Sequence, residues 1–349
     1  MSCLTSALNS CPNIQTSLDS FFNTSMTLEA MPFAEFIMSD VNRNGISQAV
    51  HPTSGKVKTV ELRYNKRILE SDLDTNVENP KCVATEKRGD CISSYTIDPT
   101  QNVSANQLIE ASDVIYNCEN NDTYIAGVIA RLVDVVERGV ATSMSSEVAA
   151  LTGAYEANVS GVIADQLVVN TLRAGTTDEI APFTMENIDL AAIQTGYGMD
   201  GIFISGGSLL YQYYRRALAG CCSDSGVDIG SLMQTYGKVV TYDKRVASAL
   251  GSTVSLMTRP GALALLYYTQ LGWLDGTPVP LIASNYYKTV IFSPRLNVPM
   301  DLIIKDDCGA LSVIVTATTK LVSGPTDQFA AGDDYEGVNW VNEIKVTNV

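Results

Sequence analysis

The stretch NDTYIAGVIARLVDVVERGVATSMSSEVAAL, residues 121–151, carries the strongest periodic pattern in the sequence. Its apolar residues recur three or four positions apart, which places their side chains on one face of an α-helix. They are Ile125, Val128, Ile129, Leu132, Val136, Val140, Met144, Val148 and Leu151. Asn121, Asp122 and Thr123 are residue types that cap helix starts. The pattern predicts one amphipathic helix over residues 121–152, about 45 Å long.

This helix is intrinsically weak. Gly127, Gly139 and many valines lower its helix propensity. We therefore expect a sheet or neighbouring subunits to cover its apolar stripe, because packing supplies most of the stability of such helices. Residues 154–173 are expected to continue as further helix.

Two strand candidates precede the helix. In KVKTVELRYN, residues 56–65, Val60, Leu62 and Tyr64 alternate with polar residues, and CISSYTI, residues 91–97, alternates in the same way. That period is typical of a half-buried strand. We predict a long β-hairpin whose charged tip projects from the body, with a solvated loop as the alternative for the tip. The tip residues expected to contact another subunit are Lys66, Arg67, Glu70, Asp72, Asp74, Lys81, Glu86, Lys87 and Arg88.

The rest of the chain gives shorter signals. Residues 1–50 are polar and predict an extended arm with at most one short helix. Strands are expected at 201–205, 239–243, 253–257, 281–293, 300–306 and 311–322, and helices at 185–194, 209–218 and 260–272. The last 25 residues are expected to form a polar tail.

Composition limits the function classes. The chain has 349 residues, is 46% hydrophobic and carries a net charge of −15 at pH 7. Such a chain can bury a core and should not attract nucleic acid through a general basic surface, although DNA could be enclosed. The first residues lack the pattern of a secretory signal, and no apolar run is long enough to span a membrane. Without an export signal, the eight scattered cysteines are interpreted as reduced thiols.

Motifs for chemistry are weak. GYGMDG, residues 196–201, has the glycine spacing of a dinucleotide-binding turn. The expected order, helix before and strand after, is the reverse of what that fingerprint needs, so a helix-to-strand turn is favoured. DVNRNG, residues 40–45, matches half of a calcium loop, but His51 stands where a bidentate Glu is required, so a turn is favoured again. No catalytic, cofactor-binding or metal-binding residue is predicted.

The order of arm, extended loop, long helix and mixed α/β region resembles the major capsid proteins of tailed bacteriophages, which have the Hong Kong 97 fold. GISQAVHPTSGKVKTVELRYNKRILESDL, residues 45–73, resembles the loop region of capsid proteins from Bacteroides-type phages, crAss-like and related. MTRPGALALLYYTQLGW, residues 257–273, and DLIIKDDCGALSVIVT, residues 301–316, resemble a later peripheral helix and the returning strands. The resemblance covers most of residues 40–320.

The resemblance implies an α+β capsid fold. Residues 1–55 would be an N-terminal arm, 56–97 the E-loop, 98–184 the P domain with spine helix 121–152, 185–300 the A domain, and 301–349 a returning P-domain strand and C-terminal tail. It also implies pentamers and hexamers forming an icosahedral shell around double-stranded DNA. The shell would be a virion component assembled in the host cytoplasm, with portal, scaffolding and decoration proteins as partners. An encapsulin-like nanocompartment shell and a soluble α/β enzyme using residues 196–207 are the alternatives.

Overall fold

The computed structural model is mixed α/β. It describes residues 14–25, 28–43, 48–49, 59–65, 90–98, 102–110, 121–151, 166–170, 202–212, 215, 238–271, 273–274, 277–278, 280–283, 286–306, 310–323 and 341–347.

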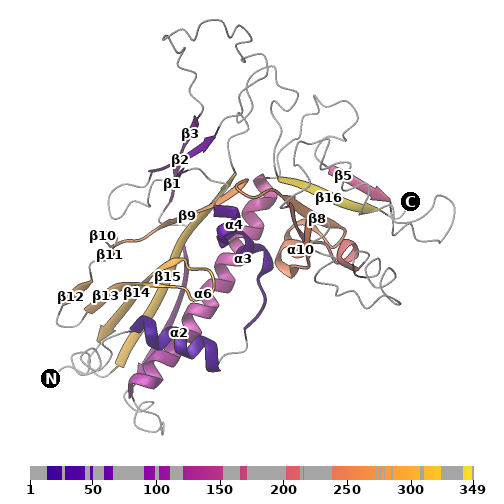
Figure 1. The fold of residues 1–349 in the computed structure, drawn as a ribbon. Coiled ribbons are helices and arrows are strands. Elements are labelled where there is room, and N and C mark those ends of the chain that lie inside the picture. Colours follow the sequence, from indigo (N-terminus) through magenta and orange to yellow (C-terminus); the bar gives the residue numbers. More distant parts are fainter. Residues whose placement is uncertain are drawn as a thin grey trace, which may run out of the picture.

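The predicted long helix is confirmed as α6 (Asn121–Leu151), which crosses the middle of the molecule (Figure 1). The large sheet packs on it through β4 and β15, and α2, α3 and α10 pack around it. It is buried beyond the expected stripe, because Ala130, Val133 and Ala141 are also inaccessible. Within residues 124–151, the exposed positions of α6 lie on one side of the helix: Arg131, Val135, Thr142, Ser146 and Ala150.

The large sheet is antiparallel throughout. Its strand order is β12 (Leu281–Ala283), β13 (Tyr286–Phe292), β14 (Pro299–Asp306), β15 (Ala310–Ser323) and β4 (Val103–Glu110). β15 changes partners along its length: residues 310–317 pair with β4, and residues 318–323 pair with β9 (Leu263–Tyr268). A Cβ at Gly139 would lie 2.4 Å from Cγ1 of Val103, so the absence of a side chain there lets α6 approach β4 closely.

A second, mixed sheet lies beside the upper end of α6 in the view of Figure 1, on the side of the helix away from the large sheet. Its order is β5 (Gln166–Asn170), β16 (Val341–Thr347), β8 (Val254–Thr258), β6 (Ile202–Gly206) and β7 (Lys238–Thr241). α10 (Lys244–Leu250) contacts both this sheet and α6. Asp243 caps α10 by accepting a hydrogen bond from the Arg245 amide at 2.9 Å. β10 (Trp273–Leu274) and β11 (Thr277–Pro278) form a separate short ribbon.

The N-terminal region is not the extended arm that the sequence predicts. It contains α2 (Ile14–Ser25), α3 (Pro32–Met38) and α4 (Asp40–Arg43), and Leu18, Phe22, Phe33 and Ile37 belong to the core. The Phe36 ring stacks on Phe203 of β6 with ring centroids 4.0 Å apart. The prediction failed because the apolar run at residues 31–38 is short, and its burial depends on partners far along the chain.

Three further expectations are wrong. Residues 263–268 form strand β9 instead of a helix, β5 replaces expected helix at 166–170, and β16 draws residues 341–347 of the expected tail into a sheet. LALLYY in β9 is apolar on both faces, and periodicity cannot distinguish such a run from a buried helix.

The expected division at residue 300 falls within β14, and β12 and β13 pair into the same sheet as β15. The expected division of the chain into domains stays a prediction.

Candidate functional site

The predicted hairpin is present, although its tip lies outside the described residues. β2 (Thr59–Asn65) and β3 (Asp90–Thr96) pair antiparallel from Thr59↔Thr96 to Asn65↔Asp90, and β1 (Gln48–Ala49) pairs with β2. The strands that carry the tip are thus confirmed. The nine predicted contact residues all fall between positions 66 and 88, so their placement stays a prediction.

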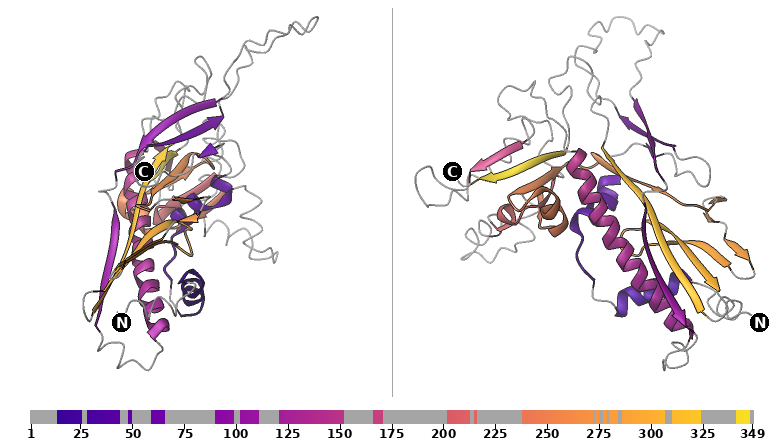
Figure 2. Two further views of the ribbon diagram at one scale, coloured as in Figure 1. Left: turned by 90° about the vertical axis from the view of Figure 1, so that its left-hand side faces the viewer. Right: turned by 180° about the vertical axis from the view of Figure 1, so that it is seen from behind.

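The hairpin stands apart from the body. Within the part of the chain that the structure describes, β1, β2 and β3 form a sheet of their own and pair with no strand of the two larger sheets. Figure 2 shows the hairpin extending beyond the end of the β9–β15 pair in both views. A two-stranded hairpin is marginally stable alone in water, so its base and its neighbours decide how well it is ordered.

The base of the hairpin is fastened to β9 and β15, in a region that we call the seat. Ile97 is 2% exposed and clusters with Ala264, Leu266, Tyr268 and Val322, with Tyr95 packed beside them. The Tyr95 hydroxyl donates a hydrogen bond to the Ser323 carbonyl at 2.8 Å. The Lys320 ammonium donates one to the Thr96 carbonyl at 3.0 Å.

The β9–β15 ribbon serves two contacts because its side chains alternate between faces. Ala264 lies opposite Val322, and both belong to the seat. Leu265 lies opposite Leu321, and these residues pack into the main core beside α6. The same short run therefore joins the hairpin base to the body.

Two glutamates on α6 tie the helix to the backbone of the large sheet. Glu147 accepts hydrogen bonds from the Leu321 amide at 2.5 Å and the Ser143 hydroxyl at 3.1 Å. Leu321 of β15 pairs with β9 on one side. Its amide points to α6 instead, where the Glu147 carboxylate accepts it. Buried backbone amides without an acceptor are costly, and the glutamate removes that cost here.

Glu137 plays the corresponding part for the turn between β13 and β14. Its carboxylate is fully buried and accepts a hydrogen bond from the Arg295 amide at 3.2 Å. Burial raises the pKa of Glu137, while hydrogen bonds from Ser293 and Arg295 act in the opposite direction. The Arg295 guanidinium also pairs with Glu35 of α3 at 2.5 Å.

A second buried polar cluster lies on β13 and β14. Lys288 and Asp301 are both almost inaccessible, with Nζ 4.0 Å from Oδ1, and the Gln270 side chain accepts a hydrogen bond from Lys288. Asp301 also accepts from the Gln270 amide at 3.0 Å. Burial lowers the pKa of Lys288 and raises that of Asp301. The cluster fixes the segment after β9 onto the sheet.

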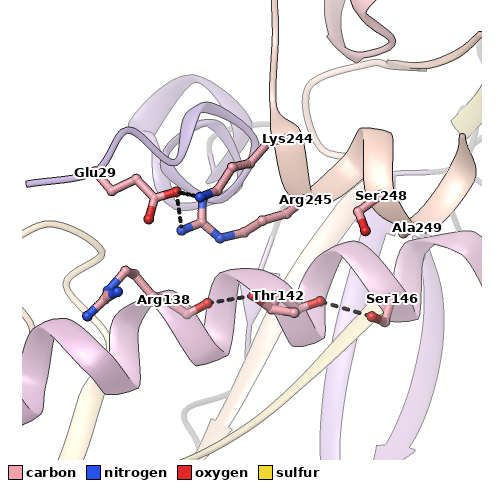
Figure 3. A pocket seen from close by; sticks show the side chains of 8 residues that line it. All are labelled: Glu29, Arg138, Thr142, Ser146, Lys244, Arg245, Ser248 and Ala249. Atoms are coloured by element: carbon pink, nitrogen blue, oxygen red, sulfur yellow. Dashed lines mark hydrogen bonds and ion pairs between the residues drawn. The ribbon is translucent and has the colours of Figure 1, made fainter. Parts of the chain in front are cut away.

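One groove of about 640 Å³ lies between α6 and α10 (Figure 3). It is lined by Glu29, Arg138, Thr142, Ser146, Lys244, Arg245, Ser248 and Ala249. Glu29 pairs with Lys244 and, at 3.2 Å, with Arg245, while Arg138 pairs with Asp134 at 2.9 Å. A hydrogen bond from Lys244 is the largest effect lowering the pKa of Glu29, with the charge of Arg245 adding to it.

The groove offers little chemistry. The Thr142 and Ser146 hydroxyls donate to carbonyls of their own helix at 2.9 and 3.1 Å, which leaves them poorly placed as nucleophiles. Its three cations pair with two carboxylates of the same chain, because Lys244 and Arg245 share Glu29 and Arg138 pairs with Asp134. We interpret the groove as a structural contact in which polar side chains hold α6, α10 and the segment before α3 together.

Residues 196–201 lie outside the described part of the chain. Gly206, at φ 115°, and Gly207 form the turn after β6, where the Gly207 amide donates to the Val254 carbonyl at 2.9 Å. A Cβ at Gly207 would lie 2.7 Å from that carbonyl, so β8 fills the space beside this turn.

Among the described residues, no cluster of metal-ligand side chains occurs, and no helix has the length and apolar composition of a membrane span.

Within residues 40–45, which match half of a calcium loop, the Asn42 side chain is buried and joins two elements through hydrogen bonds. Its amide nitrogen donates to the carbonyls of Ile37 at 2.8 Å and Leu263 at 2.9 Å, and its oxygen accepts from the Gly261 amide at 2.9 Å. Its polar atoms are thus committed to joining α3 and β9, and Asp40–Arg43 is a helical turn.

Sequence reasoning missed the seat and the two glutamates of α6. A signal existed for the glutamates: Glu137 lies four positions after Val133 and three before Val140, and Glu147 lies three after Met144. Both therefore fall within the apolar stripe, where a carboxylate needs a partner. No local signal marks the seat, because Tyr95 and Ser323 are 228 positions apart.

Comparison with known proteins gives distant structural likenesses. No family model matches the chain, and no curated protein matches it. The chain is similar to a chain of Mycobacterium phage Adephagia at 10% identity and a TM-score of 0.46, covering 94% of this chain and 92% of that one. It is also similar to chains from the capsid structures of Staphylococcus phage Andhra (8% identity, TM-score 0.43, covering 86% and 83%) and cyanophage P-SCSP1u (9%, 0.44, 93% and 92%).

Proposed function

We propose that this chain is the major subunit of a bacteriophage-type capsid, which assembles through pentamers and hexamers into an icosahedral shell around double-stranded DNA. The observation that carries the proposal is the hairpin: its base is fastened to the body at the seat, and its paired strands lie outside both body sheets. A second copy would pack on this sheet, and repetition of one such contact generates a closed assembly when its rotation closes.

The parts of the proposed shell subunit correspond to this arrangement. The β2–β3 hairpin would be the E-loop, α6 the spine helix, and the large sheet with α6 the body of the P domain. The second sheet, β5-β16-β8-β6-β7, would form the core of the A domain. The charged tip residues, from Lys66 to Arg88, would set the register against a neighbour, with strand pairing and apolar burial supplying most of the affinity.

The proposed contents of the shell are consistent with the charge of the chain. A net charge of −15 opposes tight adhesion to DNA, so packaged DNA would be held by enclosure. A nanocompartment shell of the same fold would enclose protein instead. Ultraviolet absorbance of purified particles distinguishes the two contents, since only the first carries a nucleic-acid spectrum.

The deciding experiment removes the tip and leaves the base. Residues 66–89 are replaced by Asn-Gly, since Asn65 pairs with Asp90 and a two-residue turn closes such a pair. We expect the variant to fold, with circular dichroism and a thermal midpoint like those of the parent chain, and to stay unassembled in negative-stain microscopy. The parent chain should give closed shells under the same conditions. Normal shells from the variant, or a parent chain that stays monomeric at high concentration, would contradict the proposal.

A further inference from the structure

We propose that the seat is a positioning element: Tyr95, Ile97 and Lys320 fix the direction in which the hairpin leaves the body, and thereby place it on a neighbouring copy. This inference rests on the proposed shell function and adds to it the residues that aim the contact. None of the three belongs to the predicted charged tip, so they would act on the neighbour only through the hairpin.

The first support is that the seat is a separate cluster. Ile97 packs with residues of β9 and β15 that are not part of the core around α6. The ribbon residues whose side chains point to the opposite face, including Leu263 and Leu321, belong to that core. A change at Ile97 therefore loosens the hairpin base without opening a cavity beside α6.

The second support is that three consecutive residues are held in different ways. Tyr95 donates its hydroxyl proton to the ribbon, Thr96 accepts from Lys320 through its carbonyl, and Ile97 is buried. Tyr95 and Ile97 point to the same side of the strand, because alternate residues share a face. One attachment would leave the strand free to swivel, whereas attachments at successive residues fix both its tilt and its register.

The third support is the length of the hairpin strands, because a small rotation at the base moves their far ends by a large distance. β2 and β3 each have seven residues. A swivel of about 10° at the base displaces the end of a strand about 24 Å long by about 4 Å. A hydrogen bond tolerates a few tenths of an ångström, so this displacement would separate the far end of the hairpin from its partners. The seat therefore controls contacts made well beyond it.

The test compares three seat variants with a control at the same place. Tyr95→Phe removes one hydroxyl, Lys320→Met removes the ammonium but keeps the stem, and Ile97→Ala removes buried carbons. Thr96→Ala is the matched control, because its side chain is exposed and the carbonyl that accepts from Lys320 remains. Hydrogen exchange is followed in the dispersed full-length chain, and shell yield and shape are followed by microscopy.

We expect the amides of residues 59–65 and 90–96 to exchange about fivefold faster in Tyr95→Phe. The increase should reach about thirtyfold in Ile97→Ala. Amides of α6 should keep the parent rate. All three seat variants should give fewer or misshapen shells, and Thr96→Ala should match the parent chain.

The outcomes separate the two proposals. Seat variants that assemble like the parent, or whose hairpin exchange is unchanged, overturn the positioning inference and leave the shell function standing. A parent chain that forms no shells removes both. If Ile97→Ala fails to fold, Tyr95→Phe and Lys320→Met still decide the matter, because each removes a single polar group at the edge of the cluster.

Discussion

The long helix and the hairpin are stabilised in opposite ways. α6 is surrounded by the chain's own elements, with the large sheet on one side and α2, α3 and α10 around it. The hairpin is fastened to the body at the seat and otherwise pairs within its own small sheet. From the sequence, either a sheet or neighbouring subunits could cover α6, and the structure shows that the sheet does. Under the proposed function, other copies would therefore contact the hairpin and not α6.

This difference assigns two properties to two regions. The stability of a single chain should depend on α6 and its buried contacts, and assembly should depend on the hairpin and its seat. Each property can be perturbed separately, and variants of α6 that lower stability should leave the hairpin amides unaffected until the chain unfolds as a whole.

The largest effect is expected at the centre of α6. Met144 is fully buried, so Met144→Ala should lower the free energy of unfolding by about 2–5 kcal/mol, measured by denaturant titration. Val135, on the same helix, is 47% exposed, and Val135→Ala should change it by less than about 0.5 kcal/mol. Equal losses from the two variants would show that the sheet and the shorter helices do not cover α6.

A smaller effect is expected where α6 meets β15. Glu147→Ala leaves the Leu321 amide without its acceptor and should lower the free energy of unfolding by about 1–3 kcal/mol. Glu147→Gln retains an acceptor oxygen and should cost less. The exchange rate of the Leu321 amide, followed by NMR, provides a direct check: it should rise in the Ala variant more than in the Gln variant. An unchanged rate would mean that the glutamate does not protect that amide.

Sequence patterns predicted the elements in which apolar and polar residues recur at a regular spacing. β15 alternates cleanly, and α6 repeats at three and four positions, so both were found with nearly correct ends. β9 was mistaken for a helix because one face packs on the core and the other on the seat, which removes the alternation. The N-terminal helices were missed because α3 is short and its stability comes from distant partners such as Phe203.

The candidate site divides in the same way. The hairpin strands could be predicted, since alternation and the charged segment between them are local features of the sequence. The seat could not, because each of its polar contacts joins residues more than two hundred positions apart. Residues that aim a projecting element are set by the fold of the body, and a single sequence does not display that fold.

The smallest effect concerns pH and compares buried with exposed carboxylates. Burial raises the pKa of Glu137 above its ordinary value of 4.5, and burial raises the pKa of Asp301 similarly above 3.8. The folded state then binds these protons more tightly than the unfolded state, so stability falls as pH rises from the ordinary values through the raised folded pKa values. Glu29 has a lowered pKa and acts oppositely, losing its contribution only as pH falls below 4.5. Above about pH 5 the contribution of Glu29 is constant, so it does not enter the slope measured there.

Glu137→Gln tests this assignment because the amide cannot ionise and still offers an oxygen to the Arg295 amide. We expect the variant to lose less stability than the parent as pH rises from about 5 to 8. The charged groups facing Glu137 are Asp134 on its own helix and Arg295 from the β13–β14 turn, and both are unchanged in the variant. The free energy of unfolding at each pH gives the slope directly. Because the helix carries this carboxylate and the hairpin does not contact it, hydrogen exchange of the hairpin should show no matching change with the substitution. A slope that is identical in variant and parent would mean that Glu137 ionises in the folded chain as readily as in water, and would contradict the raised pKa that its burial implies.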